Sequence, residues 1–275
     1  MYTQHWKLSS RPFENRCESQ FYYPAELHQA ALLKLHYTIE NRRAACVLCG
    51  PTGIGKTFLV HQLRQQLGES FRGLTNLVFP ALNEAQWLNY FVDALDASAG
   101  GAVGAANGLA RFERYLLKQI DARTHPTIVV DEAQLLEQYG LLEPLRLLLN
   151  VAADRAPGEA AWTLVLVGQE MTLAHVERYH ALDERLAVKC VVSRMRPEET
   201  AAYIQHRVRA AHGDASAIFE PSALEAIECL SQGLPRRINR LCDLALMIGY
   251  AEDLPRVTAE VIDSVHADLA AHVSM

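Results

Sequence analysis

Short apolar runs alternate with segments of helical periodicity over the first two thirds of the chain. Unbroken apolar runs predict buried strands, whereas apolar residues three and four positions apart predict helices that cover a sheet. We expect strands at 44–49, 74–79, 127–130, 162–167 and 188–192, and helices at 25–41, 58–63, 84–97, 109–122 and 141–153. This alternation predicts an α/β fold with a parallel sheet.

The pattern changes after Pro197, where helical periodicity continues without an evident strand. Helices are expected at 198–211, 221–231, 234–249 and 258–271. We therefore expect a domain boundary near Arg196, between the α/β part and an all-helical part. The alanine- and glycine-rich segment Ser98–Gly108 predicts a mobile loop or a small-residue linker.

The composition of the 275 residues is that of an ordinary soluble globular protein, with 50% hydrophobic and 21% charged residues. A net charge of −6 argues against a general nucleic-acid coat or a polybasic membrane binder. No apolar stretch approaches the roughly 18 residues that span a bilayer, and the start lacks the apolar segment of a signal peptide. We expect no transmembrane segment and a cytoplasmic location.

The strand at 44–49 is followed by a phosphate-binding loop that matches G-x-x-x-x-G-K-[ST]. The expected nucleotide-binding residues are Gly50, Pro51, Thr52, Gly53, Ile54, Gly55, Lys56, Thr57 and Phe58. Gly53 and Gly55 allow backbone amides to approach phosphates closely, and Lys56 brings a positive charge to the β- and γ-phosphates. The Thr57 hydroxyl is expected to be a ligand for Mg²⁺. The loop therefore predicts that the chain binds a nucleoside triphosphate with Mg²⁺.

A second phosphate motif ends the strand at 127–130, where Asp131 and Glu132 follow an apolar run. Asp131 is placed to hold the Mg²⁺ that Thr57 also touches. Glu132 is placed to polarise a water for attack on the γ-phosphorus. Alone, such a run is often only a strand before a helix, but together with the phosphate-binding loop it predicts hydrolysis.

Blocks along nearly the whole chain resemble AAA+ ATPases of the general secretion pathway protein A type. The matching blocks are Pro12-Phe13 with His28, Gly50 to Thr57, Asp131 to Gln134, Leu145 to Asn150, Leu166 to Gln169, Arg185-Leu186, Glu199 to Ile204 with His206-Arg207, and Gly233 to Cys242. The resemblance implies a P-loop NTPase core of the AAA+ (ASCE) kind, a C-terminal all-helical lid, ATP hydrolysis, and assembly into a ring or filament. Similar ATPases serve transposons as target selectors. Many secretion members also carry a membrane anchor and a peptidoglycan-binding extension, neither of which we expect from these 275 residues.

On this resemblance we expect three parts. Residues 1–43 form a lead and a helix that contribute to the nucleotide pocket, residues 44–196 form the ATPase core, and residues 197–275 form the lid.

The resemblance also implies roles for three polar residues, two of which have a plainer alternative. Gln169 matches the sensor of the γ-phosphate that orients the water, the alternative being an amide that caps the next helix. Arg185 matches a finger that reaches the site of a neighbouring subunit, with Arg178 in reserve; the alternative is a surface ion pair with the adjacent acids at 183 and 184. Arg236 matches the arginine that ties the lid to the nucleotide. With Lys56 and Glu132, Gln169 and Arg185 complete the expected catalytic set.

Other positions leave their alternatives open. Asn83 fits a polar switch that holds Glu132 inactive or, equally, a helix N-cap. Aromatic residues Phe13, Tyr22 and Tyr23 fit an adenine pocket, although packing is the commoner use. Residues Arg185–Arg209 hold six Lys or Arg against two acids, which suits either nucleic-acid phosphate or salt bridges between subunits.

The first hypothesis is an oligomeric AAA+ ATPase that hydrolyses ATP at a subunit interface and drives or regulates a macromolecular assembly of the secretion or pilus type. Its partners would be other copies of the chain and an unidentified protein. The alternative is an ATP-switched, DNA-binding adaptor of the transposition target-selector type with slow hydrolysis. A helicase, which Asp131 to Gln134 also suggests, would need a second α/β motor unit that the residues after 197 do not supply.

Overall fold

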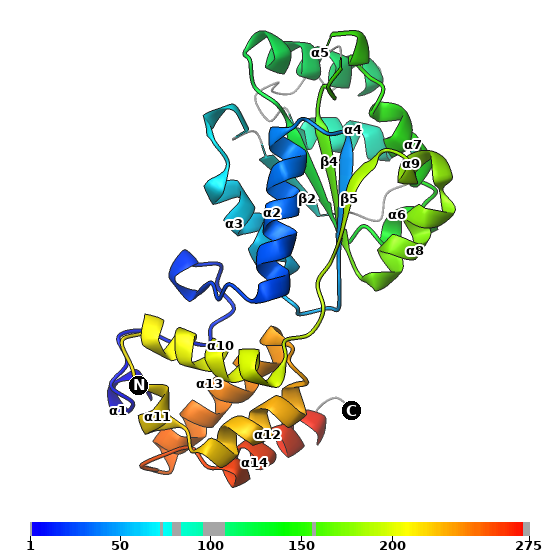
Figure 1. The fold of residues 1–275 in the computed structure, drawn as a ribbon. Coiled ribbons are helices and arrows are strands. Elements are labelled where there is room, and N and C mark those ends of the chain that lie inside the picture. The colour runs from blue at the N-terminus through cyan, green and yellow to red at the C-terminus, as the bar shows by residue number, and fades with distance from the viewer. Residues whose placement is uncertain (1, 72–73, 79–83, 96–107, 156–157, 272–275) are drawn as a thin grey trace. The chain divides into compact units, whose positions relative to one another are not determined.

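The computed structural model describes residues 2–71, 74–78, 84–95, 108–155 and 158–271 (Figure 1). They fall into two compact units. The sheet unit comprises Leu27–Pro51 and Leu59–Val192. The helical unit comprises Met1–Glu26, Thr52–Phe58 and Ser193–Met275. Asn83 and residues 98–107, for which the sequence suggested a switch and a loop, lie outside the described residues.

A five-stranded parallel sheet forms the centre of the sheet unit. Its strands are β1 (Ala45–Cys49), β2 (Leu74–Val78), β3 (Thr127–Asp131), β4 (Thr163–Gly168) and β5 (Leu186–Val191), in the order β2-β3-β4-β1-β5. Strand β4 separates the strand before the phosphate-binding loop from the strand that ends in Asp131. The predicted parallel α/β sheet of a P-loop NTPase is confirmed.

Burial along the strands follows their position in the sheet. Every residue of β1 and β4 is buried, and so are the first four residues of β3, because these strands have a neighbour on each side and helices over both faces. The edge strand β5 has mostly half-buried or exposed residues, with Cys190 the buried one. The unbroken apolar runs in the sequence therefore mark the central strands, whose carboxyl ends carry both phosphate motifs.

Helices cover the sheet, with α2 and α3 on one side of the strands and α6 and α8 on the other (Figure 1). The helical segments that lie wholly or mostly in this unit are α2 (Glu26–Glu40), α3 (Lys56–Gln66), η2 (Glu69–Phe71), α4 (Glu84–Leu95), α5 (Gly108–Asp121), α6 (Leu135–Gln138), α7 (Leu142–Leu148), η3 (Ala153–Arg155), α8 (Glu170–Arg178) and α9 (His180–Asp183). Phe91, Phe112 and Trp162 meet edge to face beneath α4 and α5, with ring centroids 5.4–6.4 Å apart. Removing the fully buried Trp162 ring would cost about 3–5 kcal/mol.

The helix expected at 141–153 is shorter than its leucine pattern suggests. Helix α7 ends at Leu148, turns follow, and η3 begins at Ala153. The Trp162 indole N–H donates to the Leu148 carbonyl at 3.1 Å, which satisfies an acceptor at the end of the helix. Ala152 has φ +60°, a conformation that no helix interior contains. Leu149, directly after the helix, is buried as well, so the run of leucines indicates burial and not a continued helix.

The helical unit contains only helices among its described elements. They are α1 (Tyr2–His5), η1 (Ser19–Phe21), α10 (Pro197–Ala210), α11 (Ala215–Ile218), α12 (Pro221–Ser231), α13 (Pro235–Ala251) and α14 (Ala259–Ala271). The N-terminal residues pack into the core of this unit. Tyr2, Trp6, Phe13 and Phe21 are buried among residues of α10 to α14, and the Trp6 indole donates to the Leu246 carbonyl at 2.9 Å.

The buried Arg207 holds the N-terminal lead onto α10. Its guanidinium donates to the carbonyls of Pro12 and Glu14 and, at 2.9 Å, to the Tyr203 hydroxyl, and it lies over the Phe21 ring. Tyr203 in turn donates to Asn239 at 2.8 Å. A buried guanidinium is stable only with such a full set of partners, so Arg207 is a structural residue of this unit. The division of the chain into three parts at 43/44 and 196/197 stays a prediction.

Candidate nucleotide-binding site

The phosphate-binding loop leaves the carboxyl end of β1 and leads directly into α3. Gly53 has φ +83° and Gly55 has φ +104°, conformations that side chains rarely tolerate. Ile54, between them, is fully buried and anchors the turn. Lys56 and Thr57 begin α3, so they sit where helix N–H groups lack intrahelical acceptors and favour an anion.

Arg236 meets this loop within the helical unit. Its backbone N–H donates to the Gly53 carbonyl at 3.1 Å. A Cβ on Gly53 would lie 2.8 Å from the Cβ of Arg236, so the loop must have glycine there. Gly233 fixes the turn before α13: its φ is +67°, and a Cβ there would lie 2.2 Å from the Met195 carbonyl oxygen. The exposed guanidinium of Arg236 therefore starts from a backbone that is fixed beside the loop.

The three aromatic residues proposed for an adenine pocket have different surroundings. Tyr22 packs edge to face on Phe58 in the first turn of α3, with centroids 5.5 Å apart. Burial raises the pKa of Tyr22 to about 12. Phe13 is buried against Phe219, and Tyr23 packs on Tyr203, both in the core of the helical unit. Only Tyr22 thus lies against the expected nucleotide-binding residues, and its role stays a proposal.

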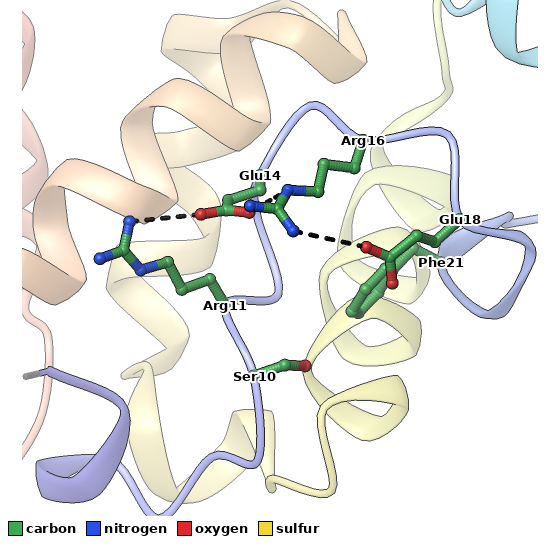
Figure 2. Close-up of a pocket in the computed structure, with 6 residues that line it drawn as sticks. All are labelled: Ser10, Arg11, Glu14, Arg16, Glu18 and Phe21. Atoms are coloured by element: carbon green, nitrogen blue, oxygen red, sulfur yellow. Dashed lines mark hydrogen bonds and ion pairs between the residues drawn. The ribbon is translucent and has the colours of Figure 1, made fainter.

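A pocket of about 410 Å³ lies in the N-terminal lead (Figure 2). It is lined by Ser10, Arg11, Glu14, Arg16, Glu18 and Phe21. Arg16 pairs with Glu14 at 2.6 Å and with Glu18 at 3.9 Å, and Arg11 pairs with Glu14 at 3.2 Å. Since the two guanidiniums already contact carboxylates, this pocket is not a site of free positive charge.

The turn after β3 carries the acidic residues. Asp131 ends the strand half-buried, and its Oδ1 accepts the backbone N–H of Glu132 at 2.9 Å. Glu132 is exposed and has φ +55°, although it is not glycine. Left-handed backbone on such a residue costs about 1 kcal/mol or more and is found at functional sites. The Ala133 N–H donates to the Val167 carbonyl at 2.9 Å, which ties the turn to the end of β4.

Gln134 links the two carboxyl ends through its side-chain amide. Its Nε2 donates to Glu132 Oε2 at 2.5 Å, and its Oε1 accepts the backbone N–H of Gln169 at 3.1 Å. Gln169 directly follows β4, beside β3, where the sequence analysis expected it. Its side chain makes no capping hydrogen bond to α8, so the capping alternative is not what the structure contains.

Arg185 precedes the amino end of β5, whereas the phosphate-binding loop follows the carboxyl end of β1. Leu186 is opposite Ala45 in the register, so Arg185 lies about six residues, roughly 20 Å, below Gly50 along the strands. That is beyond the reach of an arginine side chain. Arg185 donates to Asn150 Oδ1 at 2.8 Å. The alternative ion pair with the acids at 183 and 184 is not present among the described residues. The reserve candidate Arg178 pairs with Glu137.

Besides Arg185, four of the six basic residues between 185 and 209 pair with other side chains or are buried. Lys189 pairs with Asp183 at 2.7 Å and Glu177 at 3.1 Å, and Arg196 pairs with Glu26 at 2.6 Å. Arg194 donates to Gln232, and Arg207 is buried. These contacts reduce the free positive charge that the segment offers to nucleic acid.

The donors expected to hold Mg²⁺ suit that ion. The Asp131 carboxylate and the Thr57 hydroxyl are oxygen ligands, which a hard divalent cation prefers. Strand β3 brings Asp131 to the same edge of the sheet from which the phosphate-binding loop departs. Their role as metal ligands stays a proposal.

Two residues of the site carried no assigned role in the sequence analysis. Gln134 lies two residues after Glu132, and Gly168 directly precedes Gln169. A Cβ on Gly168 would lie 2.1 Å from Thr172 Oγ1 and 2.9 Å from Gln134 Oε1. Both residues occur in the blocks that resemble known ATPases, and this resemblance was the signal that could have identified them. Their roles were missed because Gln134 contacts Gly168 and Gln169, which lie 34 and 35 positions away in the chain.

Comparisons with known proteins agree with this geometry. The AAA domain family model matches residues 39–176. General secretion pathway protein A of Aeromonas hydrophila is 29% identical over 272 residues, which cover 98% of this chain and 47% of that protein. The predicted resemblance to this type of ATPase is confirmed, although the chain spans only about half the length of this relative.

Two solved structures show the same fold. ORC2 of Aeropyrum pernix, in ADPNP-ADP complexes, has a TM-score of 0.72 and 16% identity, covering 94% of this chain and 71% of its own. ORC1 of Aeropyrum pernix, in complex with DNA, has a TM-score of 0.63 and 17% identity, covering 88% of this chain and 65% of its own. Among the residues that the structure describes, none of the helices has the length and apolar character that crossing a membrane requires.

Proposed function

The chain is an ATPase that belongs to the AAA domain family, and on this premise we propose that it hydrolyses ATP with Mg²⁺ at an interface between copies of itself. One observation above all supports this proposal: the turn after β3 holds the Glu132 carboxylate in place at the carboxyl end of that strand. A carboxylate fixed beyond the end of a buried strand has a water-facing position and a defined direction, which a general base requires.

The roles of the other residues follow from their positions. The glycine-lined turn presents backbone N–H groups to the phosphates, and Lys56 neutralises charge on the β- and γ-phosphates. Asp131 and Thr57 would hold Mg²⁺, which supplies positive charge against the phosphate oxygens when bound. Glu132 would accept the proton of the attacking water, and Gln169 would orient that water and sense the γ-phosphate.

A second copy supplies the remaining charge in this proposal. Arg185 lies too far from the loop of its own chain along the strands, and within the described part of the chain its guanidinium donates to the neutral Asn150. A guanidinium with a neutral partner keeps its charge available for another molecule. We therefore assign Arg185 to the site of a neighbouring copy, where it would stabilise charge on the γ-phosphate.

Mixing variants tests this arrangement. Glu132→Gln should keep the affinity for a fluorescent ATP analogue and lose about 10²-fold or more in turnover. Arg185→Ala should also lose turnover, and mixing it with Glu132→Gln should restore part of it, because mixed interfaces pair an intact Glu132 with an intact Arg185. Arg155→Ala, at an exposed arginine paired with its neighbour Asp154, is the matched control and should leave turnover unchanged.

Each failure has a separate meaning. Wild-type turnover in Glu132→Gln removes Glu132 as the base. Absence of rescue in the mixture removes Arg185 as the finger in trans, and rescue of Arg178→Ala by the same partner would assign that role to Arg178.

The work that hydrolysis drives is proposed from the relative. General secretion pathway protein A is the name of the matched protein, and we propose that this chain likewise drives or regulates a protein assembly of the secretion or pilus type, in the cytoplasm, where ATP is supplied. The ATP-switched DNA adaptor is the alternative. It predicts ATP-dependent filaments on duplex DNA, visible by electron microscopy, and salt-dependent DNA binding. No DNA binding at low salt would remove it.

A further inference from the structure

Gln134 contacts two groups of opposite hydrogen-bonding character with one side chain. The Glu132 carboxylate only accepts hydrogen bonds, and the backbone N–H of Gln169 only donates. The Gln134 amide meets both, since Nε2 donates to Glu132 Oε2 at 2.5 Å and Oε1 accepts from Gln169 N at 3.1 Å. These two partners also fix which end of the amide faces which group. Glutamate and methionine match glutamine in length and leucine is one atom shorter, but ionised glutamate lacks the donor, and leucine and methionine lack the amide altogether.

The backbone around Gln134 is built for this contact. The Ala133 N–H is held by the Val167 carbonyl at 2.9 Å, which places the following residue beside the end of β4. Gly168 leaves the space into which the Gln134 amide reaches, because a Cβ there would lie 2.9 Å from Gln134 Oε1. The contact therefore depends on a residue of β4 that has no side chain.

The Glu132 side chain needs such a hold. It is exposed and starts from a left-handed backbone, and a free glutamate at the surface samples many rotamers. In this turn, the Glu132 backbone N–H donates to the Asp131 carboxylate. Among the described residues, no backbone N–H of the turn donates to the Glu132 carboxylate. Gln134 thus supplies the directional contact that fixes the Glu132 carboxylate.

We propose that Gln134 is a positioning residue for hydrolysis, which orients the Glu132 carboxylate and ties it to the backbone that carries Gln169. This inference rests on the proposed role of Glu132 as the base. It adds that one side chain joins the base to the end of β4, so that a displacement of the Gln169 backbone changes the direction of the Glu132 carboxylate.

The test measures turnover in a double-mutant cycle. Gln134→Leu should lower kcat about tenfold at saturating ATP, because misplacing a catalytic group is costly even when the group is present. KM and the affinity for a fluorescent ATP analogue should stay within about twofold, since Gln134 is not expected to contact the nucleotide. Gln138→Leu is the matched control at an exposed glutamine of α6 and should leave kcat unchanged.

The cycle separates positioning from a general structural effect. In the Glu132→Gln background, Gln134→Leu should have no further effect on the residual rate, because there is no base left to orient. Gln134→Glu is the second variant. It keeps an acceptor for the Gln169 N–H but cannot donate to Glu132 when ionised, so it should lose kcat as Gln134→Leu does while keeping the thermal midpoint of unfolding.

The results distinguish this inference from the function on which it rests. Unchanged kcat in Gln134→Leu, with Glu132→Gln inactive, overturns the role of Gln134 alone. An equal fold-loss in both backgrounds also overturns it, since Gln134 would then act without Glu132. Wild-type turnover in Glu132→Gln instead overturns the proposed base, whatever Gln134 does.

Discussion

The loop after β1 and the turn after β3 both leave buried parallel strands, yet their backbones are strained at different kinds of residue. In the loop, positive φ falls on Gly53 and Gly55, where no side chain opposes it. In the turn, positive φ falls on Glu132, whose backbone and side chain are held by Asp131 and Gln134. The loop presents backbone amides by removing side chains, whereas the turn presents a side chain by surrounding it with others.

The difference decides how each region tolerates substitution. A loop made of glycines depends on space, so any added Cβ damages it. A turn held by side chains depends on its hydrogen bonds. Replacing one donor by a group of similar size that cannot donate is therefore enough to free the Glu132 carboxylate. The following expectations probe that contrast, beginning with the largest effect.

Gly168→Ala should have the largest effect because Gly168 provides space, as the loop glycines do, and that space admits the Gln134 side chain that holds the turn. The new Cβ would lie 2.1 Å from Thr172 Oγ1, which is in a fully buried region, and 2.9 Å from Gln134 Oε1. We expect the free energy of unfolding to fall by about 3 kcal/mol, the upper end of the usual cost of overpacking, and turnover to fall with it. Urea unfolding measures the first and ATP hydrolysis the second. A stable variant with wild-type turnover would show that the end of β4 does not need a glycine.

Acid should destabilise the protein through His125, at the opposite end of β3 from the acidic turn. Burial, with a smaller effect of Arg42, lowers the pKa of His125 to about 4. The unfolded chain, with a pKa near 6.5, takes up the proton first, so stability is complete above about pH 6.5 and is lost as the pH falls toward 4. The loss should reach about 2 kcal/mol at pH 5 in urea unfolding, relative to pH 8.

His125→Gln is the control for that pH dependence. It keeps a donor toward the Thr163 hydroxyl, which His125 Nε2 contacts at 2.8 Å, and removes the titrating group. The slope of stability between pH 8 and 5 should become smaller in this variant. If acid lowers turnover equally in both proteins while both remain folded, the loss of turnover does not arise from His125.

Gly53→Ala should weaken nucleotide binding through the loop alone. The alanine would adopt φ +83° and press on the Arg236 side chain, so we expect about a tenfold higher Kd for an ATP analogue, equivalent to about 1.4 kcal/mol. Gly140→Ala is the matched control, because φ is +66° there and no heavy atom lies within 4 Å of the added Cβ. Equal affinity in the two variants would contradict the importance of space in the loop.

The smallest effect should come from the strain at Glu132. Glu132→Gly relieves the left-handed conformation and Glu132→Ala retains it, so the glycine variant should be the more stable of the two by about 1 kcal/mol. Both should lose turnover. A more stable alanine variant would mean that the backbone at 132 relaxes once the carboxylate is gone.

Much of this architecture follows from the sequence because its signals are local. Unbroken apolar runs identified the central strands, and the spacing of glycine, lysine and threonine identified the loop at Gly50 to Thr57. The length of the helix at 141–153 was overestimated, since Leu149 is buried just beyond the end of α7, where the Trp162 indole donates to the Leu148 carbonyl. The local sequence pattern does not predict the hydrogen bond between Leu148 and Trp162, which lie 14 positions apart.

The sequence by itself determined the parallel fold, the nucleotide-binding loop and the acidic pair, because each is written in consecutive residues whose chemistry is specific. Tertiary structure decided which groups hold them. It placed Gln134 between Glu132 and the Gln169 backbone, and this approach requires glycine at 168. It also put Arg185 at the amino end of the strands and packed the N-terminal lead around Arg207. The physical reason is that hydrogen bonds and steric limits act between neighbours in space, and the parallel sheet order brings together strand ends that are distant in the chain.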